Sequence, residues 1–405
     1  MTTATLSAPS ADLLLDPAEP QTPREAYLAR VAEVQTRSRE RSAAAHRQAP
    51  HGTPTHNFLL CAANRHHYLP EHPATEAEFF AEVMAHRDWA ALDEQEAQVF
   101  GLTRFTGDTS FLADVHSRPR VFCTFHLGSY RMIHHFLLRH GIHYTLVVDQ
   151  VTLEQQGDKF QALRQSNPVY HGGSMRILNA ESPSIGLQMI REIKAGRSLL
   201  FYIDGNTGVG GMDRQDDKLT RINFLSRQIY ARKGIAFISH VTRTPIVPLL
   251  HLRHGAADYE THFFAPIEPT ESELPREEFA AATTQHIFGL FEPVLRRHPE
   301  QWEGWLYMNH FVDQNALREA HPPRPVPATA PGPLSFNQAR YRVFWHADTP
   351  QLFDQATYQT FAISDKLAAL LPQLAALPAE VQQRFSATPL FQDLWARQVV
   401  VAAGE

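Results

Sequence analysis

A histidine lies where an expected buried strand ends and the next helix begins. The segment FHLGSYR (125–131) follows the apolar run VFCT. In open α/β sheets, ligands bind in the crevice at the carboxyl ends of the strands. A neutral His126 imidazole there can accept a proton from a hydroxyl or an amine, and backbone N–H groups at the helix start can face an oxyanion. The pattern indicates acyl transfer, while a histidine that only caps the helix or packs in the core would give the same local pattern.

Alternating apolar runs predict the elements that position this histidine. Helical stretches are expected from about Ser129, over 184–196 and over 229–242. Because uniformly apolar runs are typical of strands covered on both faces, the alternation predicts an α/β fold with a mostly parallel central sheet flanked by helices. The expected strands are 121–125, 144–149, 198–204 and 244–252.

Length and composition limit the function classes. At about 150 residues per domain, 405 residues predict two to three folding units. A net charge of −6 argues against a nucleic-acid partner, since such proteins are usually basic. Two cysteines without a CxxC motif indicate a reduced, cytoplasmic setting. The N-terminus has no basic region of a signal peptide, and no run approaches the ~20 apolar residues of a membrane span, so we expect membrane contact that is peripheral at most, on the inner membrane face.

Composition also suggests the domain limits. Residues 1–50 are rich in Ala, Ser, Thr and Pro around one helical pattern, and this composition predicts a flexible arm. The α/β domain is expected over 51–320, with an early helix capped by a Thr75/Glu78 box. Six prolines in the thirteen residues 321–333 predict a linker. Residues 334–405 then form a small β/α appendage.

Five segments follow one another in the chain: VFCTFHLGSY (121–130), SLLFYIDGNTG (198–208), INF (222–224), ARKGIAFISHVTRTPIVPL (231–249) and RHPEQWEGWLYMNHF (297–311). In this order they resemble the lysophospholipid acyltransferase superfamily, specifically the bacterial branch related to lipid A lauroyl acyltransferases. The resemblance spans roughly 110–312, about half of the chain. It implies an acyltransferase-like core in which His126 is the general base. It also implies an acyl thioester donor, on acyl carrier protein or coenzyme A, with no tightly bound cofactor and no metal.

The chain departs from the family pattern at one position. The family usually has Asp or Glu five residues after the histidine, and here that position is Arg131. An arginine cannot accept a hydrogen bond from the imidazole, and its charge would lower the pKa of the histidine. Asp204, which matches the family's later acidic-glycine segment, is the favoured replacement, and Asp149 is the second choice. The alternative for Asp204 is a turn cap beside Gly205.

Further residues are substrate-binding candidates. Arg131 could stabilise the thioester oxygen or hold an anionic group of the acceptor, since guanidinium binds such groups bidentately. By the resemblance, basic residues beside the later segments could face donor or acceptor anions, although each alone is also typical of a solvated surface. The candidates are Gly128, Ser129, Tyr130, Arg131, Gly205, Asn206, Arg221, Arg232 and Lys233.

Other chemistries fit less well. The glycine-rich GNTGVGG (205–211) matches neither nucleotide-binding template and has no Walker lysine. The histidines at 134, 135, 140 and 143 lack the spacing of a zinc helix. No GxSxG nucleophile elbow occurs, and Cys123 lies within an expected buried strand.

The acceptor is left open as a hydroxyl or an amine on a lipid, a small molecule or a peptide. Residues 334–405 are similar to small winged-helix-like peptide-recognition modules, which implies that an edge strand takes up a peptide by β-augmentation. A dimerisation or lid element is the alternative. Because Arg131 replaces the usual acid, a non-catalytic protein that binds acyl chains or acyl carrier protein is the competing hypothesis.

Overall fold

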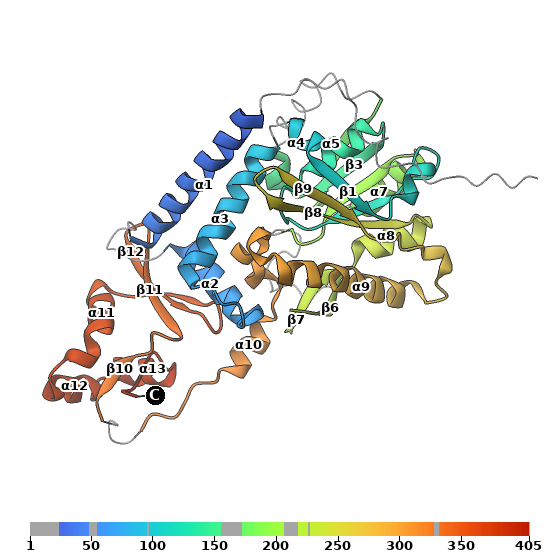
Figure 1. The fold of residues 1–405 in the computed structure, drawn as a ribbon. Coiled ribbons are helices and arrows are strands. Elements are labelled where there is room, and N and C mark those ends of the chain that lie inside the picture. Colours follow the sequence, from blue (N-terminus) through green and yellow to red (C-terminus); the bar gives the residue numbers. More distant parts are fainter. Residues whose placement is uncertain are drawn as a thin grey trace, which may run out of the picture. The chain divides into compact units, whose positions relative to one another are not determined.

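The computed structural model describes residues 24–47, 55–94, 97–154, 172–205, 218–225, 227–327 and 332–404. The chain divides into two compact units (Figure 1). The first takes its residues from 1–39 and 82–304, and the second from 40–81 and 305–405. These limits differ from the expected ones at 50, 320 and 333, because residues 40–81 pack with the C-terminal residues. For example, Asn64 donates to the carbonyl of Trp305 at 2.8 Å.

The first unit is an α/β fold around a seven-stranded, mostly parallel sheet, as expected. The strand order is β1-β9-β8-β2-β5-β3-β4, and among the described pairings of this sheet only β8–β9 is antiparallel. The strands of this sheet are β1 (Thr103–Gly107), β2 (Val121–Thr124), β3 (His143–Val148), β4 (Ser174–Asn179), β5 (Ser198–Tyr202), β8 (Ile246–Gly255) and β9 (Asp258–Phe263).

Helices cover both faces of this sheet. In Figure 1, α4 and α5 lie on the side opposite α8 and α9. On the α5 side, Phe122 is in register with Leu200 and with Val247, and these side chains belong to one buried core with the apolar face of α5. The helices with residues in this unit are α1 (Arg24–Arg47), α3 (Glu76–Asp93), α4 (Ala97–Gly101), α5 (Met132–Arg139), α7 (Ile185–Lys194), α8 (Gly234–Thr242) and α9 (Arg276–Arg297).

The structure differs from the sequence-based expectation in two segments, residues 229–242 and the N-terminal arm. The helix expected over 229–242 begins only at α8, because its first residues form β7 (Arg227–Arg232), which pairs with β6 (Leu219–Phe224) as an antiparallel hairpin. The β-branched and aromatic side chains of Ile229 and Tyr230 favour that strand. The expected N-terminal arm contains α1, whose Tyr27 and Val31 are buried in the core of the first unit, and Trp89 donates to the carbonyl of Val31 at 3.0 Å.

The second unit combines short sheets with short helices. The three-stranded antiparallel sheet has the order β11-β12-β13, and a separate pair joins β10 to β14. Its strands are β10 (Leu334–Phe336), β11 (Tyr341–His346), β12 (Thr349–Asp354), β13 (Thr360–Ala362) and β14 (Val400–Ala402). Its α-helices are the end of α1, α2 (His56–Tyr68), the start of α3, α10 (Gln314–Ala320), α11 (Asp365–Leu370), α12 (Ala379–Ser386) and α13 (Pro389–Ala396).

Two sequence signals are visible in this unit. The capping box at the start of α3 is confirmed: Thr75 N–H donates to Glu78 Oε2 at 2.9 Å, and Glu78 N–H donates to Thr75 Oγ1 at 3.3 Å. The proline-rich residues 321–327 form no helix or strand. They are anchored to the unit by Arg324, whose guanidinium lies 3.5 Å from the Trp395 ring centroid.

None of the helices within the described ranges is both long enough and apolar enough to cross a membrane.

Candidate active site

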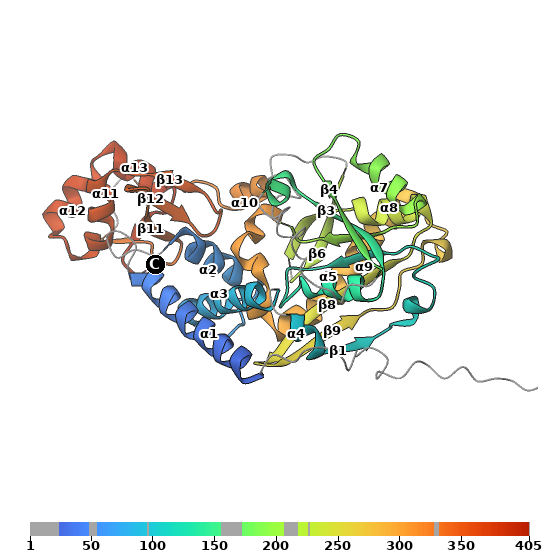
Figure 2. The ribbon, with the colours of Figure 1, turned by 90° about the horizontal axis from the view of Figure 1, so that it is seen from above.

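The register of two parallel strands brings His126 and Asp204 together. Thr124 of β2 lies opposite Tyr202 of β5. The amide of Ile203 then donates to the carbonyl of Thr124 at 3.0 Å, which carries the pairing one step further. Because parallel strands advance in step, the next opposed residues are His126 and Asp204. They therefore meet at the carboxyl ends of β2 and β5, where ligands bind in open α/β sheets (Figure 2 shows the sheet from above).

The Asp204 carboxylate accepts hydrogen bonds from three groups. Nδ1 of His126 lies 2.8 Å from Oδ1, and the backbone N–H of His126 donates to Oδ2 at 3.0 Å. The indole Nε1 of Trp302 donates to Oδ2 at 2.6 Å. Since the Asp204 side chain is only 1% exposed, these donors replace the water that a buried carboxylate loses. They also orient Oδ1 toward the imidazole.

The hydrogen bond at Nδ1 sets the chemistry of the His126 ring. When Nδ1 carries the proton that Asp204 accepts, the lone pair of the neutral ring is on Nε2. Burial opposes the charged ring, but the charge and hydrogen bond of Asp204, together with the charge of Glu303, raise the pKa of His126. The side chain keeps 20% exposure. The arrangement can therefore take a proton at Nε2 and stabilise the resulting imidazolium.

Two tyrosine rings flank the imidazole. The Tyr130 ring centroid lies 4.7 Å from that of His126, edge to face, and the Tyr202 centroid lies 4.9 Å away. The hydroxyl of Tyr202 is 2.9 Å from Nε2 of His134, whose Nδ1 is 2.8 Å from the hydroxyl of Tyr144. Burial lowers the pKa of His134 to about 3, so this histidine is neutral. His134 thus holds Tyr202 beside the His126 ring.

Arg131 is paired with an acidic residue from another element. Its Nη1 lies 2.5 Å from Oε2 of Glu94, which directly follows α3, and its guanidinium lies 5.4 Å from the Tyr130 ring centroid. The hydroxyl of Tyr130 donates to Oε2 of Glu303 at 3.3 Å. Arg131 and Tyr130, both expected near a substrate, therefore lie close to His126, with their polar groups already in contact with carboxylates.

Gly128 and Ser129 have structural partners. The N–H of Gly128, a substrate-binding candidate, donates to the carbonyl of Gln301 at 2.9 Å, so this amide is occupied by a backbone partner. Gly128 has φ +58°, and a Cβ there would lie 2.4 Å from the carbonyl oxygen of His251. The buried hydroxyl of Ser129 donates to Asp93. Both residues shape the turn that carries His126.

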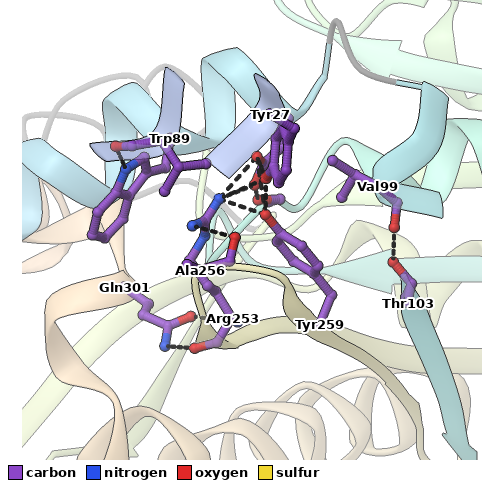
Figure 3. Close-up of polar contacts among 11 residues, drawn as sticks. Tyr27, Trp89, Val99, Thr103, Arg253, Ala256, Tyr259 and Gln301 are labelled. Carbon is purple, nitrogen blue, oxygen red and sulfur yellow. Dashed lines mark hydrogen bonds and ion pairs between the residues drawn. The ribbon is translucent and has the colours of Figure 1, made fainter. Parts of the chain in front are cut away.

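Asp93, the acceptor of the Ser129 hydroxyl, belongs to a buried polar cluster. Figure 3 shows Tyr27, Arg253 and Tyr259 of this cluster. Arg253 Nη2 lies 2.9 Å from Asp93 Oδ1, and the two side chains are 3% and 0% exposed. The hydroxyl of Tyr27 donates to Asp93 at 2.6 Å, and Arg253 also donates to the hydroxyl of Tyr259 at 2.5 Å. The cluster thereby links α1, α3, β8 and β9 to the turn after His126.

The remaining candidates lie on neighbouring elements. Gly205 follows Asp204 in the turn after β5, and Asn206 is outside the described residues. Both Nε and Nη2 of Arg221 on β6 contact the hydroxyl of Tyr230, at 3.0 and 2.8 Å. Lys233, at the start of α8, pairs with Glu277 at 2.7 Å.

The alternatives have other surroundings. Asp149 accepts a hydrogen bond from the amide of Thr152 at 2.6 Å and so caps the residues that follow it. Burial raises the pKa of the Cys123 thiol, which keeps it protonated in β2. The ranges that the structure describes contain no group of three His, Cys, Asp or Glu side chains suited to a metal ion. The segment 206–211 of the glycine-rich loop lies outside those ranges.

Sequence reasoning missed the roles of Trp302, Glu303 and Glu94. Trp302 and Glu303 lie in the last of the five segments quoted above, but nothing in the spacing indicated that an indole would contact Asp204. Glu94 is one of many acidic residues near the end of α3. A tryptophan in a short polar segment after a long helix was the one available signal, because a buried indole N–H requires an acceptor.

Comparisons with known proteins add little to this geometry. No family model matches the chain. No curated protein matches it either. Among solved structures, the 1-acyl-sn-glycerophosphate (LPA) acyltransferase PlsC from Thermotoga maritima is similar over 61% of this chain and 97% of its own, with 11% identity and a TM-score of 0.30. A likeness this weak identifies no activity.

Proposed function

We propose that this protein is an acyltransferase that moves a fatty acyl group from a thioester to a hydroxyl or an amine, with His126 as general base and Asp204 as its orienting partner. The observation that carries the proposal is the 2.8 Å contact between His126 Nδ1 and Asp204 Oδ1 at the carboxyl ends of β2 and β5. The five-segment resemblance to lysophospholipid acyltransferases supports the choice of reaction, and the contact supplies the acidic partner that Arg131 does not.

The proposed reaction needs only proton transfer and substitution at a carbonyl. Nε2 of His126 takes the proton of the acceptor O–H or N–H while the acceptor atom bonds to the thioester carbon. The carbonyl π electrons move to oxygen and return as the C–S bond breaks. The thiolate that leaves then takes the proton from Nε2, which restores the neutral imidazole and releases the thiol. Throughout, Asp204 stabilises the transient imidazolium.

Arg131 is the proposed partner of the negative charge on the substrate side. The Gly128 amide is occupied, whereas the guanidinium lies beside the Tyr130 ring that touches His126. A fixed cation there favours a developing oxyanion or an anionic group of the acceptor or donor. The donor is proposed to be acyl carrier protein or coenzyme A carrying the acyl chain, with a lipid, small-molecule or peptide acceptor.

A peptide amine is a specific acceptor to include. The three-stranded sheet of the second unit ends at β13, whose three residues pair with β12. Within the described ranges, no strand is recorded on the other side of β13. An edge of this kind can take up an extended peptide through its backbone groups. Hydroxyl-bearing lipids and peptide amines should therefore be compared on the full chain.

The test measures thiol release from acyl-coenzyme A and from acylated carrier protein, with and without a panel of alcohols and amines. We expect acceptor-dependent release by the wild type and a loss of about 100- to 10,000-fold in His126→Gln, the range for a general base. His143→Gln, which changes an exposed histidine at the start of β3, is the matched control and should remain active. A wild type that retains bound acyl ligand but releases no thiol, with binding unaffected by His126→Gln, would make it an acyl-binding protein instead.

A further inference from the structure

Residues 301–303 pair with the turn that carries His126. The amide of Glu303 donates to the carbonyl of His126 at 3.0 Å, and the amide of Gly128 donates to the carbonyl of Gln301 at 2.9 Å. These two bonds make an antiparallel bridge between Leu127 and Trp302. The segment therefore determines where the backbone of His126 lies.

The same segment is anchored to the sheet from its other side. The Gln301 side chain accepts from the amide of Arg253 at 2.9 Å and donates to its carbonyl at 2.7 Å (Figure 3). The side-chain amide of Gln301 thus pairs with both backbone groups of Arg253, as a residue of a neighbouring strand would. The position of residues 301–303 is thus set by β8 and not by the turn alone.

The indole of Trp302 is held in one orientation. It is 1% exposed, stacks on Phe125 with 5.8 Å between ring centroids, and meets Phe224 edge to face at 5.9 Å. A Cβ at position 304 would lie 2.1 and 2.2 Å from two carbons of the indole, so glycine at 304 leaves the space that the ring fills. Packing therefore aims Nε1 at Asp204.

We propose that Trp302 is a positioning residue for the proposed base, because its indole N–H holds Oδ2 of Asp204 and so keeps Oδ1 on Nδ1 of His126. The inference rests on the proposed function and names a further residue of the same site. Oδ1 contacts Nδ1 at 2.8 Å, while Oδ2 receives Nε1 at 2.6 Å. A carboxylate whose two oxygens have different fixed donors cannot rotate without losing one of them.

The fixed position of the Asp204 carboxylate selects the tautomer of the neutral His126 ring. With Oδ1 fixed, the neutral His126 ring keeps its proton on Nδ1 and its lone pair on Nε2, the atom that would meet the acceptor. Without the indole donor, Oδ2 keeps only the backbone N–H of His126, which lies 3.0 Å from Oδ2 and 3.1 Å from Oδ1. Because this donor serves both oxygens, it does not hold either of them in place, and the carboxylate can turn away from the ring. The Nδ1 hydrogen bond would then be made for part of the time, and the other tautomer would be populated.

The test is Trp302→Phe in the full chain, with the His126 ring followed by ¹⁵N NMR and assigned by its absence in His126→Gln. Phenylalanine keeps an aromatic ring beside Phe125 and removes the indole donor together with part of the ring. We expect a lower titration midpoint for His126, a smaller Nδ1–H fraction and thiol release reduced by about 10- to 100-fold. Trp395→Phe is the control, because it removes an equivalent buried indole donor, 3.1 Å from the carbonyl of Pro325, in the second unit.

Gly304→Ala is the second variant, because it keeps the indole N–H but displaces the ring. The same changes in midpoint and tautomer are expected, and this variant decides the question if Trp302→Phe does not fold. A midpoint and tautomer equal to the wild type in the folded variant would overturn the proposal. So would a higher midpoint, since the indole would then only withdraw charge from Asp204. If the wild type releases no thiol from any thioester, the proposed function fails, while the NMR measurement still decides the role of Trp302.

Discussion

Arg131 and Glu94 form an ion pair, 2.5 Å between Nη1 and Oε2, one aromatic ring away from His126. Arg131 stands where the resemblance leads us to expect an acidic residue. Burial and the charge of Arg131 act to lower the pKa of His126, but Asp204 and Glu303 outweigh them, and the net pKa is raised. A cation at this position is therefore compatible with the proposed base, because Asp204 in the turn after β5 supplies the acidic partner and Glu94 balances the charge of the arginine.

Removing Glu94 should expose the His126 ring to the full charge of Arg131. For Glu94→Gln we expect the acid limb of the pH profile of kcat/KM to move to lower pH, since a nearby cation disfavours the imidazolium. The shift should stay below about one pH unit, because solvent and salt screen a partly exposed pair. The control is Glu268→Gln, which breaks a comparable pair with Arg118 (2.6 Å). A limb that stays in place or moves upward would contradict this electrostatic role.

Replacing Asp204 by asparagine should lower thiol release more than removing a neighbouring charge does. The amide NH2 would face either Nδ1 of His126 or the indole N–H of Trp302, both of which are donors in the structure. Either the imidazole takes the opposite tautomer or a buried donor loses its acceptor. We expect thiol release to fall about 100- to 10,000-fold and the His126 titration midpoint to drop. A variant with wild-type turnover would exclude Asp204 from the mechanism.

Gly128→Ala should destabilise the first unit. Alanine would have to adopt φ +58° with its Cβ 2.4 Å from the carbonyl oxygen of His251. We expect a loss of about 1–3 kcal/mol in the free energy of unfolding, measured by denaturant titration, with lower thiol release because the turn carries His126. Gly186→Ala in α7 is the control. Its Cβ would meet no atom within 4 Å, so this change should be neutral or stabilising.

The stability of the first unit should fall as the solution becomes acidic. Burial, with a smaller contribution from Arg253, lowers the pKa of His251 from 6.5 to about 3. Between those values the unfolded chain binds a proton at this ring that the folded chain excludes, so stability rises with pH across that window. His251→Phe keeps a ring against Tyr259 and should flatten the dependence of Tm on pH between about 3 and 6.5. The exposed His286→Phe serves as control, and equal slopes in all three proteins would refute the assignment.

The buried ion pair of Asp93 and Arg253 should matter more for folding than its surface counterparts. Asp93→Asn removes the charge that compensates Arg253 in the core. It also replaces one of the two oxygens that accept from Tyr27 and Ser129 by an NH2 donor, so one of these hydroxyls loses its acceptor. We expect a cost of about 3–5 kcal/mol in unfolding free energy. Asp258→Asn, which breaks the exposed pair with Arg104, should cost less than about 1 kcal/mol. A similar cost for both variants would show that burial of the Asp93 pair is not decisive.

Several features of this protein follow from its sequence alone. The buried strands can be recognised in the sequence as uniformly apolar runs, because a parallel sheet covered on both faces has no polar side. The box of Thr75 and Glu78 marks the start of α3, because its hydrogen bonds are local. His126 stands out because it follows a buried strand directly. Such signals depend on residues a few positions apart, so they need no tertiary structure.

The contacts that build the site depend on the tertiary structure. Asp204 becomes the partner of His126 only through the register of β2 and β5, which is a long-range pairing that spacing along the chain cannot express. The indole of Trp302 reaches Asp204 only after residues 301–303 bridge to the turn at Leu127. Likewise, Glu94 balances Arg131 because α3 ends near that turn. Each of these contacts joins residues far apart in sequence, and their geometry is fixed by packing rather than by local preference.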